Sequence, residues 1–374
     1  MTKHRGHNEG SIFQRERDGR WVAKVTLHDG GRKELVAKTK AEALTRLRDF
    51  QKNQEQGVEI LDTRQTVAQY LERWLNDVAR DTVRPGTFES YASIVRTRVN
   101  PTIGKVQLSK LSGQQVQALY GILKERGLSP ASIVRTHAVL HRAFDQAVKW
   151  RQMVRNPVDD ANRPRVPRYE LTTLTHGDVA QLIEAAHDGT LRALYAVATT
   201  SGLRRGELLG LRWSDVSLDK GTVSVARTAQ RVDGQGWVFA EPKTQKGRRQ
   251  VRLAKMAVTE LRRHRKEQAE ARLRVGPMWK DIDCVFASEV GTPLEEARLS
   301  RCFKADLQKA GLPAVRFHDL RHTAATLLLS KNVHPKVVQE MLGHANIAIT
   351  LDTYSHVTPD MQEAAVEALD QLFA

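Results

Sequence analysis

The sequence predicts an α+β protein of several domains, in which small antiparallel sheets accompany mainly helical modules. Three observations predict this class. The chain of 374 residues is long enough for two or three domains that each bury a core. Strand patterns with hairpin signals occupy the first part of the chain, and amphipathic helical patterns follow them. Beyond residue 171 both patterns mix, which indicates a further domain that is mainly helical with a small antiparallel sheet.

The first predicted domain, residues 1–58, is a three-stranded sheet with one helix. Its strand candidates are residues 12–15, 21–27 and 34–37. Asp18-Gly19 and Asp29-Gly30-Gly31 separate these runs, and both are hairpin signals because such residues accept the backbone angles of tight turns.

The helix of this domain begins at Thr39, which is followed three residues later by Glu42 in the pattern of a capping box. We expect its apolar stripe to cover one face of the sheet, and the stripe is Leu44, Leu47 and Phe50. The opposite face would then present four basic side chains, which are Arg15, Arg20, Lys24 and Lys33. Two interpretations of these four residues stay open, a face that binds nucleic acid and a solvated basic face.

Residues 61–160 predict a compact bundle of four helices. Each helix has a start signal, and the signals are Thr66 with Gln69, Pro85-Gly86-Thr87, Ser112 with Gln115, and Ser129-Pro130. We assign the apolar stripes of these helices to the core. The basic residues face either a partner or solvent, and they are Arg96, Arg98, Arg135, Arg142 and Lys149.

Residues 161–170 predict an interdomain linker. Pro164 and Pro167 lie in a basic run that cannot be helical and favours an extended chain, suited to lying along a phosphate backbone. The last domain, residues 171–374, combines helices with strand candidates at residues 222–225, 236–239 and 249–253.

Composition narrows the classes of partner. Lysine and arginine total 59 against 43 acidic residues, which gives a net charge of +16. Such a surface favours polyanions, because each neutralised phosphate releases counterions. Two cysteines, Cys284 and Cys302, argue against a disulfide scaffold or a cysteine-rich zinc site, and we expect both to be buried. The sequence shows neither a signal-peptide pattern nor an apolar run long enough to span a membrane, so we expect a cytosolic chain.

The first basic patch of the last domain places Arg204 just after Gly202, at the start of an apolar helix. A helix N-terminus favours an anion, and an arginine there adds a bidentate clamp for phosphate. We expect Glu207 to orient a neighbouring side chain rather than to carry chemistry. An ordinary helix start with surface arginines explains this patch equally simply.

The second patch, residues 241–249, lies between two strand candidates and is predicted to be a mobile hairpin tip. Lys243 at such a tip can reach a nucleic-acid groove and donate a proton to a departing oxygen. Arg248 and Arg249 are candidate DNA contacts beside it. The alternative is a basic loop that only aids solubility.

The third patch opens an apolar helix with His318, Arg321 and His322, which share one helical face. Two histidines four residues apart also suggest a metal site. Asp319 stands where a metalloprotease carries glutamate, and Arg321 would repel a cation, so we expect no metal. The fourth patch is Gly343-His344, and Tyr354 follows it by ten residues.

Together these patches resemble the tyrosine recombinases, or phage integrases, whose pattern is Arg, Lys, His-x-x-Arg, His or Trp, then Tyr. The matching residues, in order, are Arg204, Lys243, His318, Arg321, His344 and Tyr354. Ser201 stands where many members have threonine, and the hydroxyl is kept. The resemblance implies that residues 1–58 bind arm-type DNA, residues 61–160 bind the core site, and residues 171–374 form the catalytic domain.

The resemblance also implies the role of each residue. A free tyrosine has a pKa of about 10 and needs help to attack a phosphodiester. Tyr354 would be the nucleophile, and His318 would assist its deprotonation. Arg204 and Arg321 would grip the non-bridging oxygens. Lys243 would protonate the departing 5′ oxygen, and His344 would donate a hydrogen bond to a phosphate oxygen. The 3′-phosphotyrosyl product stores the bond energy, so neither ATP, metal nor another cofactor is expected.

The expected partners are double-stranded DNA attachment sites and three further copies of the chain, in a tetramer that passes through a Holliday junction. A directionality factor and a host DNA-bending protein are candidate accessories, and the expected location is the cytoplasm, at the nucleoid. A short helix with an apolar stripe is predicted after Tyr354, and the stripe consists of Met361, Ala365, Leu369 and Leu372. This helix either closes over its own domain or docks on a neighbouring subunit.

Two other functions keep the fold. A type IB topoisomerase would relax supercoils without exchange, and recombination between two marked sites separates it from an integrase. A non-catalytic DNA-binding regulator would lack cleavage activity.

Overall fold

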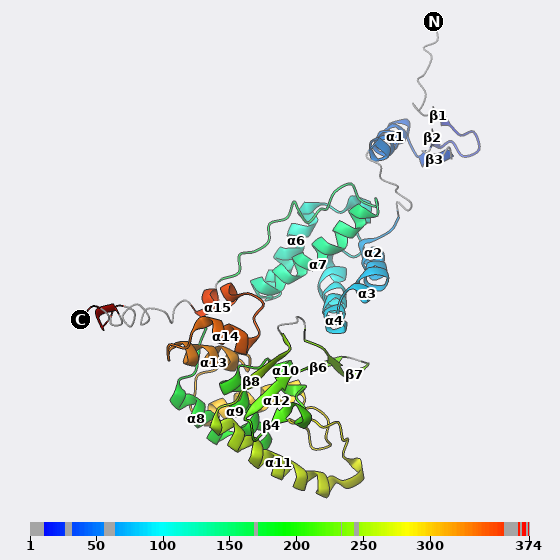
Figure 1. Ribbon diagram of the computed structural model, residues 1–374. Helices are drawn as coiled ribbons and strands as arrows, with labels where there is room; N and C mark the ends of the chain where they lie inside the picture. The colour runs from blue at the N-terminus through cyan, green and yellow to red at the C-terminus, as the bar shows by residue number, and fades with distance from the viewer. Residues whose placement is uncertain are drawn as a thin grey trace. The chain divides into compact units, whose positions relative to one another are not determined.

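The computed structural model describes residues 11–26, 32–55, 64–167, 171–232, 234–242 and 247–354, together with 366, 369–371 and 373 (Figure 1). The chain divides into two compact units, Met1–Arg168 and Tyr169–Ala374. The described elements confirm the α+β class, because helices predominate and every sheet is small and antiparallel.

The N-terminal sheet has the strand order β1-β2-β3 and is antiparallel throughout. Its elements are β1 (Ser11–Gln14), β2 (Trp21–Thr26), β3 (Arg32–Ala37) and the helix α1 (Lys40–Glu55). Leu47 of α1 packs on Ala23 and Val25 of β2, with Phe50 beside them. The predicted sheet-plus-helix arrangement is therefore confirmed.

Two predicted placements in this part of the chain are wrong. Leu44 is 36% exposed, and Ala43 is fully buried instead, so the inward stripe runs through residues 43, 47 and 50. Lys33 lies opposite Val25 in the β2–β3 register, on the face that α1 covers, and its ammonium group is 5.6 Å from the Phe50 ring centroid. Side chains alternate along a strand, so Lys33 cannot share the open face with Lys24.

The predicted bundle has the four expected helical segments, and two of them are interrupted by a π-helical turn. The first comprises α2 (Val67–Trp74), the π turn η1 (Leu75–Ala79) and α3 (Arg80–Thr82). The second comprises α4 (Pro85–Ile94), the π turn η2 (Val95–Val99) and α5 (Asn100–Ile103). After the 3₁₀ turn η3 (Leu108–Lys110) come α6 (Gly113–Glu125) and α7 (Pro130–Lys149). Thr66 and Ser112 each complete a capping box, as their sequences predict.

Aromatic packing fixes the centre of this bundle. Tyr70 and Trp74 of α2 are buried. The Tyr70 hydroxyl donates a 2.5 Å hydrogen bond to the carbonyl oxygen of Ala143, and its ring stacks on Phe144 at 6.1 Å. These contacts join α2 to α7 across the core, so the assignment of the apolar stripe to the interior is confirmed.

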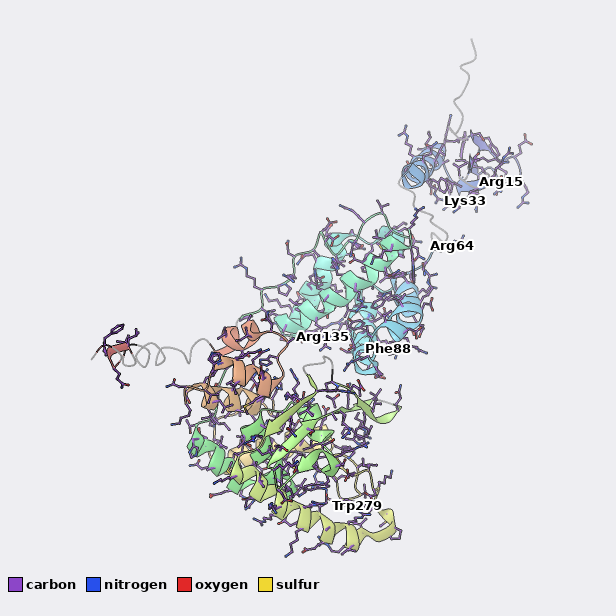
Figure 2. The ribbon with its side chains drawn as sticks, in the orientation of Figure 1. Arg15, Lys33, Arg64, Phe88, Arg135 and Trp279 are labelled. Atoms are coloured by element: carbon purple, nitrogen blue, oxygen red, sulfur yellow. The ribbon has the colours of Figure 1, made fainter. Side chains whose placement is uncertain are left out.

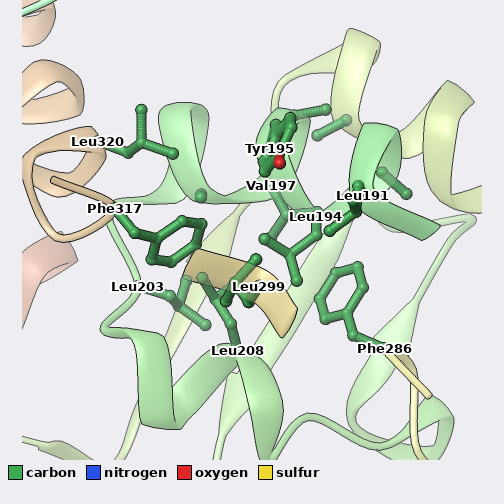
Figure 3. Packing of buried hydrophobic residues seen from close by; sticks show 14 of the residues in the cluster. Leu191, Leu194, Tyr195, Val197, Leu203, Leu208, Phe286, Leu299, Phe317 and Leu320 are labelled. Carbon is green, nitrogen blue, oxygen red and sulfur yellow. The ribbon is translucent and has the colours of Figure 1, made fainter. Parts of the chain in front are cut away.

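The second unit surrounds a buried helix, α9, with helices and two small sheets. Its helices are α8 (His176–Ala185), α9 (Gly189–Ser201), α10 (Arg205–Leu209), α11 (Lys255–Val275), α12 (Glu296–Lys309), α13 (Asp319–Leu329), α14 (Pro335–Leu342) and α15 (Ile347–Tyr354), with 3₁₀ turns η4 (Trp213–Asp215) and η6 (Gly276–Met278). Its strands are β4 (Val216–Ser217), β5 (Thr222–Val225), β6 (Thr228–Val232), β7 (Gly236–Ala240) and β8 (Arg249–Arg252). Figure 3 shows Leu194, Tyr195 and Val197 of α9 among Phe286, Leu299 and Phe317.

The strands of this unit form two separate sheets. One has the order β4-β5-β8, and the other is the pair β6-β7. β7 therefore does not pair with β8, and the segment between them connects two sheets. The predicted hairpin tip at residues 241–249 is wrong in this respect, because each flanking strand has another partner.

Both cysteines are free. Cys284 is buried, as predicted, and Cys302 is only partly buried at the edge of the core. In the part of the chain that the structure describes, no helix combines the length and the apolar character needed to cross a membrane.

Candidate active site

The site is organised around the corner between α9 and α10. Gly202 ends α9 with φ at 63°, in the left-handed region that favours glycine. A Cβ atom at Gly202 would lie 2.5 Å from Cδ2 of Leu342, the last residue of α14. The glycine therefore lets α14 approach the corner, and Arg204 follows as the N-cap residue of α10.

Glu207 is the buried centre of this corner, with 2% of its surface exposed. Its Oε1 accepts a 2.9 Å bond from Nη1 of Arg204, and its Oε2 accepts one of 2.9 Å from the backbone N–H of Arg204. Arg249 of β8 donates through Nη2 to Oε2 at 3.0 Å and through Nη1 to Oε1 at 3.3 Å. Glu207 thus orients two arginines, as the sequence predicts for it.

The charge state of Glu207 follows from these partners. Burial acts to raise the pKa of this carboxyl, but the hydrogen bond and charge of Arg249 and the N–H of Arg204 outweigh it. The pKa of Glu207 is therefore below its usual value, and the carboxylate is ionised at neutral pH.

Arg321 joins the start of α13 to the same corner. It is 3% exposed, and its Nη1 donates a 2.7 Å hydrogen bond to the carbonyl oxygen of Gly202. Arg204 reaches in another direction, and its Nη2 donates to the carbonyl oxygen of Gly343 at 3.3 Å. The two arginines predicted to grip phosphate are thus tied to one corner by backbone carbonyls.

His318 and His322 stand one turn apart at the start of α13, with ring centroids 5.4 Å apart and ring planes nearly perpendicular. Burial, followed by the charge of Arg321, lowers the pKa of His318. Burial lowers the pKa of His322 to about 4, and electrostatic repulsion by His318 is the next largest cause. Both imidazoles are therefore neutral at physiological pH, and a neutral imidazole can accept a proton.

His344 lies just beyond α14, where Gly343 ends the helix with φ at 67°. Its Nδ1 is 2.8 Å from the hydroxyl oxygen of Thr350 in α15, and its carbonyl oxygen accepts a 2.8 Å bond from Nε2 of Gln339. Burial lowers the pKa of His344 to about 4, and the charges of Arg321 and Arg204 contribute. Arg204 also contacts the residue before this histidine, because its Nη2 donates to the carbonyl oxygen of Gly343.

Two of the six predicted residues lie partly or wholly outside the part of the chain that the structure describes. Lys243 falls in the segment 243–246, outside the described residues, as does the predicted mobility of that loop. Tyr354 is the last residue of α15, and its side chain is not among those described. The backbone nevertheless relates it to the site, because α15 also carries Thr350, the partner of His344.

The predicted DNA contacts differ in exposure. Arg15 pairs with Asp18 at 2.7 Å, and Lys24 pairs with Glu34 at 3.1 Å. Arg20 is exposed, and so is Arg248, which pairs with Glu241. Figure 2 labels Arg15 and Lys33 on the N-terminal elements and Arg135 on α7.

In the bundle, four of the five basic candidates are exposed, and they are Arg96, Arg135, Arg142 and Lys149. Arg98 instead donates to the carbonyl oxygen of Ser132 and to the hydroxyl of Thr136.

Arg249, also predicted to contact DNA, differs from these residues because its side chain is turned into the protein. Its side chain is 8% exposed, and its guanidinium group is engaged by Glu207 and by the carbonyl oxygens of Met341 and Gly247. Strand alternation is the signal that could have identified it, because Arg249 shares a face of β8 with the buried Val251.

Among the residues described, no group of three histidine, cysteine, aspartate or glutamate side chains is arranged to hold a metal ion. The pair His318 and His322 belongs instead to the cluster that contains Arg321.

Two family models match the chain. Residues 172–361 match the model of the phage integrase family, and residues 66–123 match the model of the phage integrase N-terminal SAM-like domain.

Curated relatives match over most of their length. A XerC-like tyrosine recombinase of Caldanaerobacter subterraneus is 31% identical over 360 residues, covering 91% of this chain and 92% of the relative. The ICEBs1 integrase of Bacillus subtilis is 27% identical, covering 77% of this chain and 78% of the relative.

Solved structures share the fold. The Tn1549 transposon integrase in complex with transposon right end DNA has a TM-score of 0.68 at 23% identity, covering 82% of this chain and 99% of that one. A lambda integrase tetramer bound to a Holliday junction has a TM-score of 0.58 at 19% identity, covering 94% and 96%.

Proposed function

The chain belongs to the phage integrase family of tyrosine recombinases, and we propose that it recombines double-stranded DNA at the attachment sites of a mobile element. The observation that carries this proposal is the pair of bonds at the α9–α10 corner, by which Arg321 holds the carbonyl oxygen of Gly202 and Arg204 holds that of Gly343, the residue before His344. Three separated segments of the chain meet there and concentrate positive charge beside a neutral imidazole.

Two arginines would stabilise the transition state. Phosphoryl transfer spreads negative charge over the non-bridging oxygens, and preorganised donors aimed at that charge lower the barrier. We assign this role to Arg204 and Arg321. Because their other donors are fixed by Glu207 and by backbone carbonyls, little reorganisation is needed when phosphate binds.

Tyr354 would attack the phosphorus atom, and His318 would accept its proton. The lowered pKa of His318 supports this role, since the ring is neutral before the reaction. The bond between phosphorus and the 5′ oxygen breaks as the bond to the Tyr354 oxygen forms. Lys243 would return a proton to the departing 5′ oxygen, and His344 would donate a hydrogen bond to a phosphate oxygen.

The 3′-phosphotyrosyl bond would keep the energy of the broken phosphodiester. A 5′ hydroxyl from a second DNA strand can then attack it, and this restores the tyrosine and joins the strands without ATP. Two such exchanges in a homotetramer would pass through a Holliday junction, as the tetrameric lambda integrase complex suggests. A directionality factor and a host DNA-bending protein remain candidate accessories of this reaction.

The predicted division of labour also remains a proposal. Residues 1–58 would bind arm-type sites, residues 61–160 the core site, and residues 161–170 would link them to the catalytic domain at residues 171–374. Because the substrate would include chromosomal DNA, the enzyme would act in the cytoplasm, at the nucleoid.

The proposed function is tested with a nicked suicide substrate that carries the attachment core. The wild type should accumulate a covalent protein–DNA adduct, and Tyr354→Phe should bind the same DNA without forming one. A companion assay with two marked sites should yield recombinant DNA. Relaxation of supercoils without recombinants would instead favour a topoisomerase.

A further inference from the structure

Arg249 is the one arginine among the predicted DNA contacts whose guanidinium group faces the interior of the described structure. Its acceptors come from separate elements: Glu207 in α10, Met341 at the end of α14, and Gly247 just before its own strand. The bond from Nε to the carbonyl oxygen of Met341 measures 2.6 Å. An arginine placed in this way cannot act on DNA directly.

We propose that Arg249 is a positioning residue for strand cleavage, which locks Arg204 and His344 into a single phosphate-binding geometry by holding Glu207 and the end of α14 together. The inference rests on the proposed function, since it assigns how that site is held.

The end of α14 depends on Arg249 for one of its hydrogen bonds. The last carbonyl groups of a helix have no partner within it and need donors from elsewhere. Arg249 takes the carbonyl oxygen of Met341, and Arg204 takes that of Gly343. Both bonds fall within the three residues that precede His344, so together they fix where its imidazole stands.

The carboxylate of Glu207 is shared between two arginines. Arg204 and Arg249 bind both of its oxygens, so neither arginine can shift without disturbing the other. Glu207 is almost fully buried, and a buried carboxylate that loses one of two cationic partners is left poorly compensated. Movement of β8 would therefore be transmitted to Arg204.

The strand β8 follows the proposed proton donor in the sequence. Arg249 lies six residues after Lys243, on the strand that follows the segment 243–246. Anchoring the first residue of β8 fixes one end of the segment that carries Lys243. One guanidinium group would thus hold the start of β8, the phosphate-binding Arg204 and the residues before His344 in one arrangement.

Arginine is required for this role because its planar fork binds a carboxylate with two nitrogens while Nε points elsewhere. Lysine has a single ammonium group and cannot hold Glu207 and the carbonyl oxygen of Met341 with the same geometry. Arg249→Lys should therefore keep the charge and lose the function.

The test compares Arg249→Met and Arg249→Lys with the wild type in the full-length chain. Adduct formation on the suicide substrate under single-turnover conditions should fall by about 100-fold in both variants, because a misplacement of about 1 Å has that effect. DNA affinity should change by less than about threefold, since Arg249 does not reach the DNA. The matched control is Arg262→Met, because Arg262 also binds a carboxylate, that of Asp219, and a carbonyl oxygen, that of Leu218. This control should cleave like the wild type.

A pH profile separates positioning from general destabilisation. Without Arg249, burial should raise the pKa of Glu207, and protonation would release Arg204. As the pH is lowered, the cleavage rate of Arg249→Met should therefore begin to fall at a higher pH than the rate of the wild type does. In the double variant Arg249→Met with Glu207→Gln, which has no carboxyl group at position 207, this shift of the pH profile should disappear.

The inference would be overturned if folded Arg249 variants cleaved DNA at the wild-type rate. It would also be overturned if they cleaved more slowly but lost activity at the same acidic pH as the wild type. Either result would leave the proposed function intact. If Arg249→Met does not fold, the same measurements on Arg249→Lys decide the question. Absence of an adduct with the wild type would instead count against the proposed function itself.

Discussion

Individual tyrosines differ sharply in how well their surroundings suit nucleophilic attack. Tyr70, Tyr120 and Tyr195 are buried, and burial raises the pKa of each, which disfavours the phenolate. Tyr91 stacks on Trp74 at 5.9 Å. None of these four lies in the cluster around the α9–α10 corner, whereas Tyr354 ends the helix that holds His344 through Thr350.

Arg204→Lys should lower the single-turnover rate of cleavage by about 100- to 1,000-fold, the usual effect of removing a preorganised transition-state donor. Lysine cannot hold Glu207 and Gly343 while also offering a bidentate surface to phosphate. Quench-flow measurement of adduct formation checks this. Arg205→Lys is the matched control, because the adjacent Arg205 pairs with Glu296 instead. Equal losses in the two variants would refute a special role for Arg204.

His344 predicts a pH dependence of stability. Its pKa is lowered to about 4 from 6.5, so between these values the unfolded chain binds a proton that the folded chain does not. The free energy of unfolding should therefore decrease as pH falls from 6.5 to 4. In chemical denaturation at stepped pH, His344→Gln should flatten this slope, and the exposed His187→Gln should not. An unchanged slope in His344→Gln would show that the ring is not desolvated.

At the scale of elements, the helix starts were predictable because their signals are local. The capping boxes at Thr66 and Ser112 each need only four consecutive residues, and both form. The histidine–arginine face of α13 follows from helical spacing alone. Pairing of β8 with β5 instead of β7 depends on contacts between distant segments, so the strand runs could not reveal it.

Burial of charged side chains was the least predictable feature. Strand alternation separates Arg249 from its exposed neighbour Arg248, but it could not reveal the partner of Arg249, the carboxylate of Glu207, which lies 42 residues away. Leu44 and Ala43 likewise exchange their expected places, because the rotation of α1 about its axis is set by the sheet beneath it. The π turns η1 and η2 have no local sequence signal that we can identify.

The α9–α10 corner predicts a specific cost for adding one methyl group. Gly202→Ala would force a left-handed backbone angle on alanine and place its Cβ 2.5 Å from Leu342. The first effect alone costs about 1–3 kcal/mol. Gly127→Ala is the matched control, since Gly127 has φ at 79° and nothing within 4 Å of the added atom. Thermal unfolding should show a larger loss for Gly202→Ala, together with lost cleavage. Equal losses would argue against close packing of α14 on the corner.

At the scale of the whole molecule, the charge of +16 is distributed over the chain and suits a long polyanion. Ion pairs such as Lys24 with Glu34 join opposite charges and leave this net charge unchanged, and basic residues such as Arg135 and Arg142 are exposed.

DNA affinity should therefore fall steeply with salt, by at least about tenfold between 50 and 200 mM, because bound phosphates release counterions. Fluorescence anisotropy with a labelled core site measures the slope of log affinity against log salt. At saturating DNA the rate of cleavage should change far less. A flat slope would contradict extensive phosphate contact.

The central claim is that Tyr354 becomes covalently linked to DNA. The most direct measurement is peptide mapping by mass spectrometry of the adduct trapped on the suicide substrate. We expect a single modified peptide, with a 3′ nucleotide phosphate on Tyr354 and a free 5′ hydroxyl on the released strand. A linkage at any other residue, or a phosphate left on the 5′ side, would contradict this mechanism.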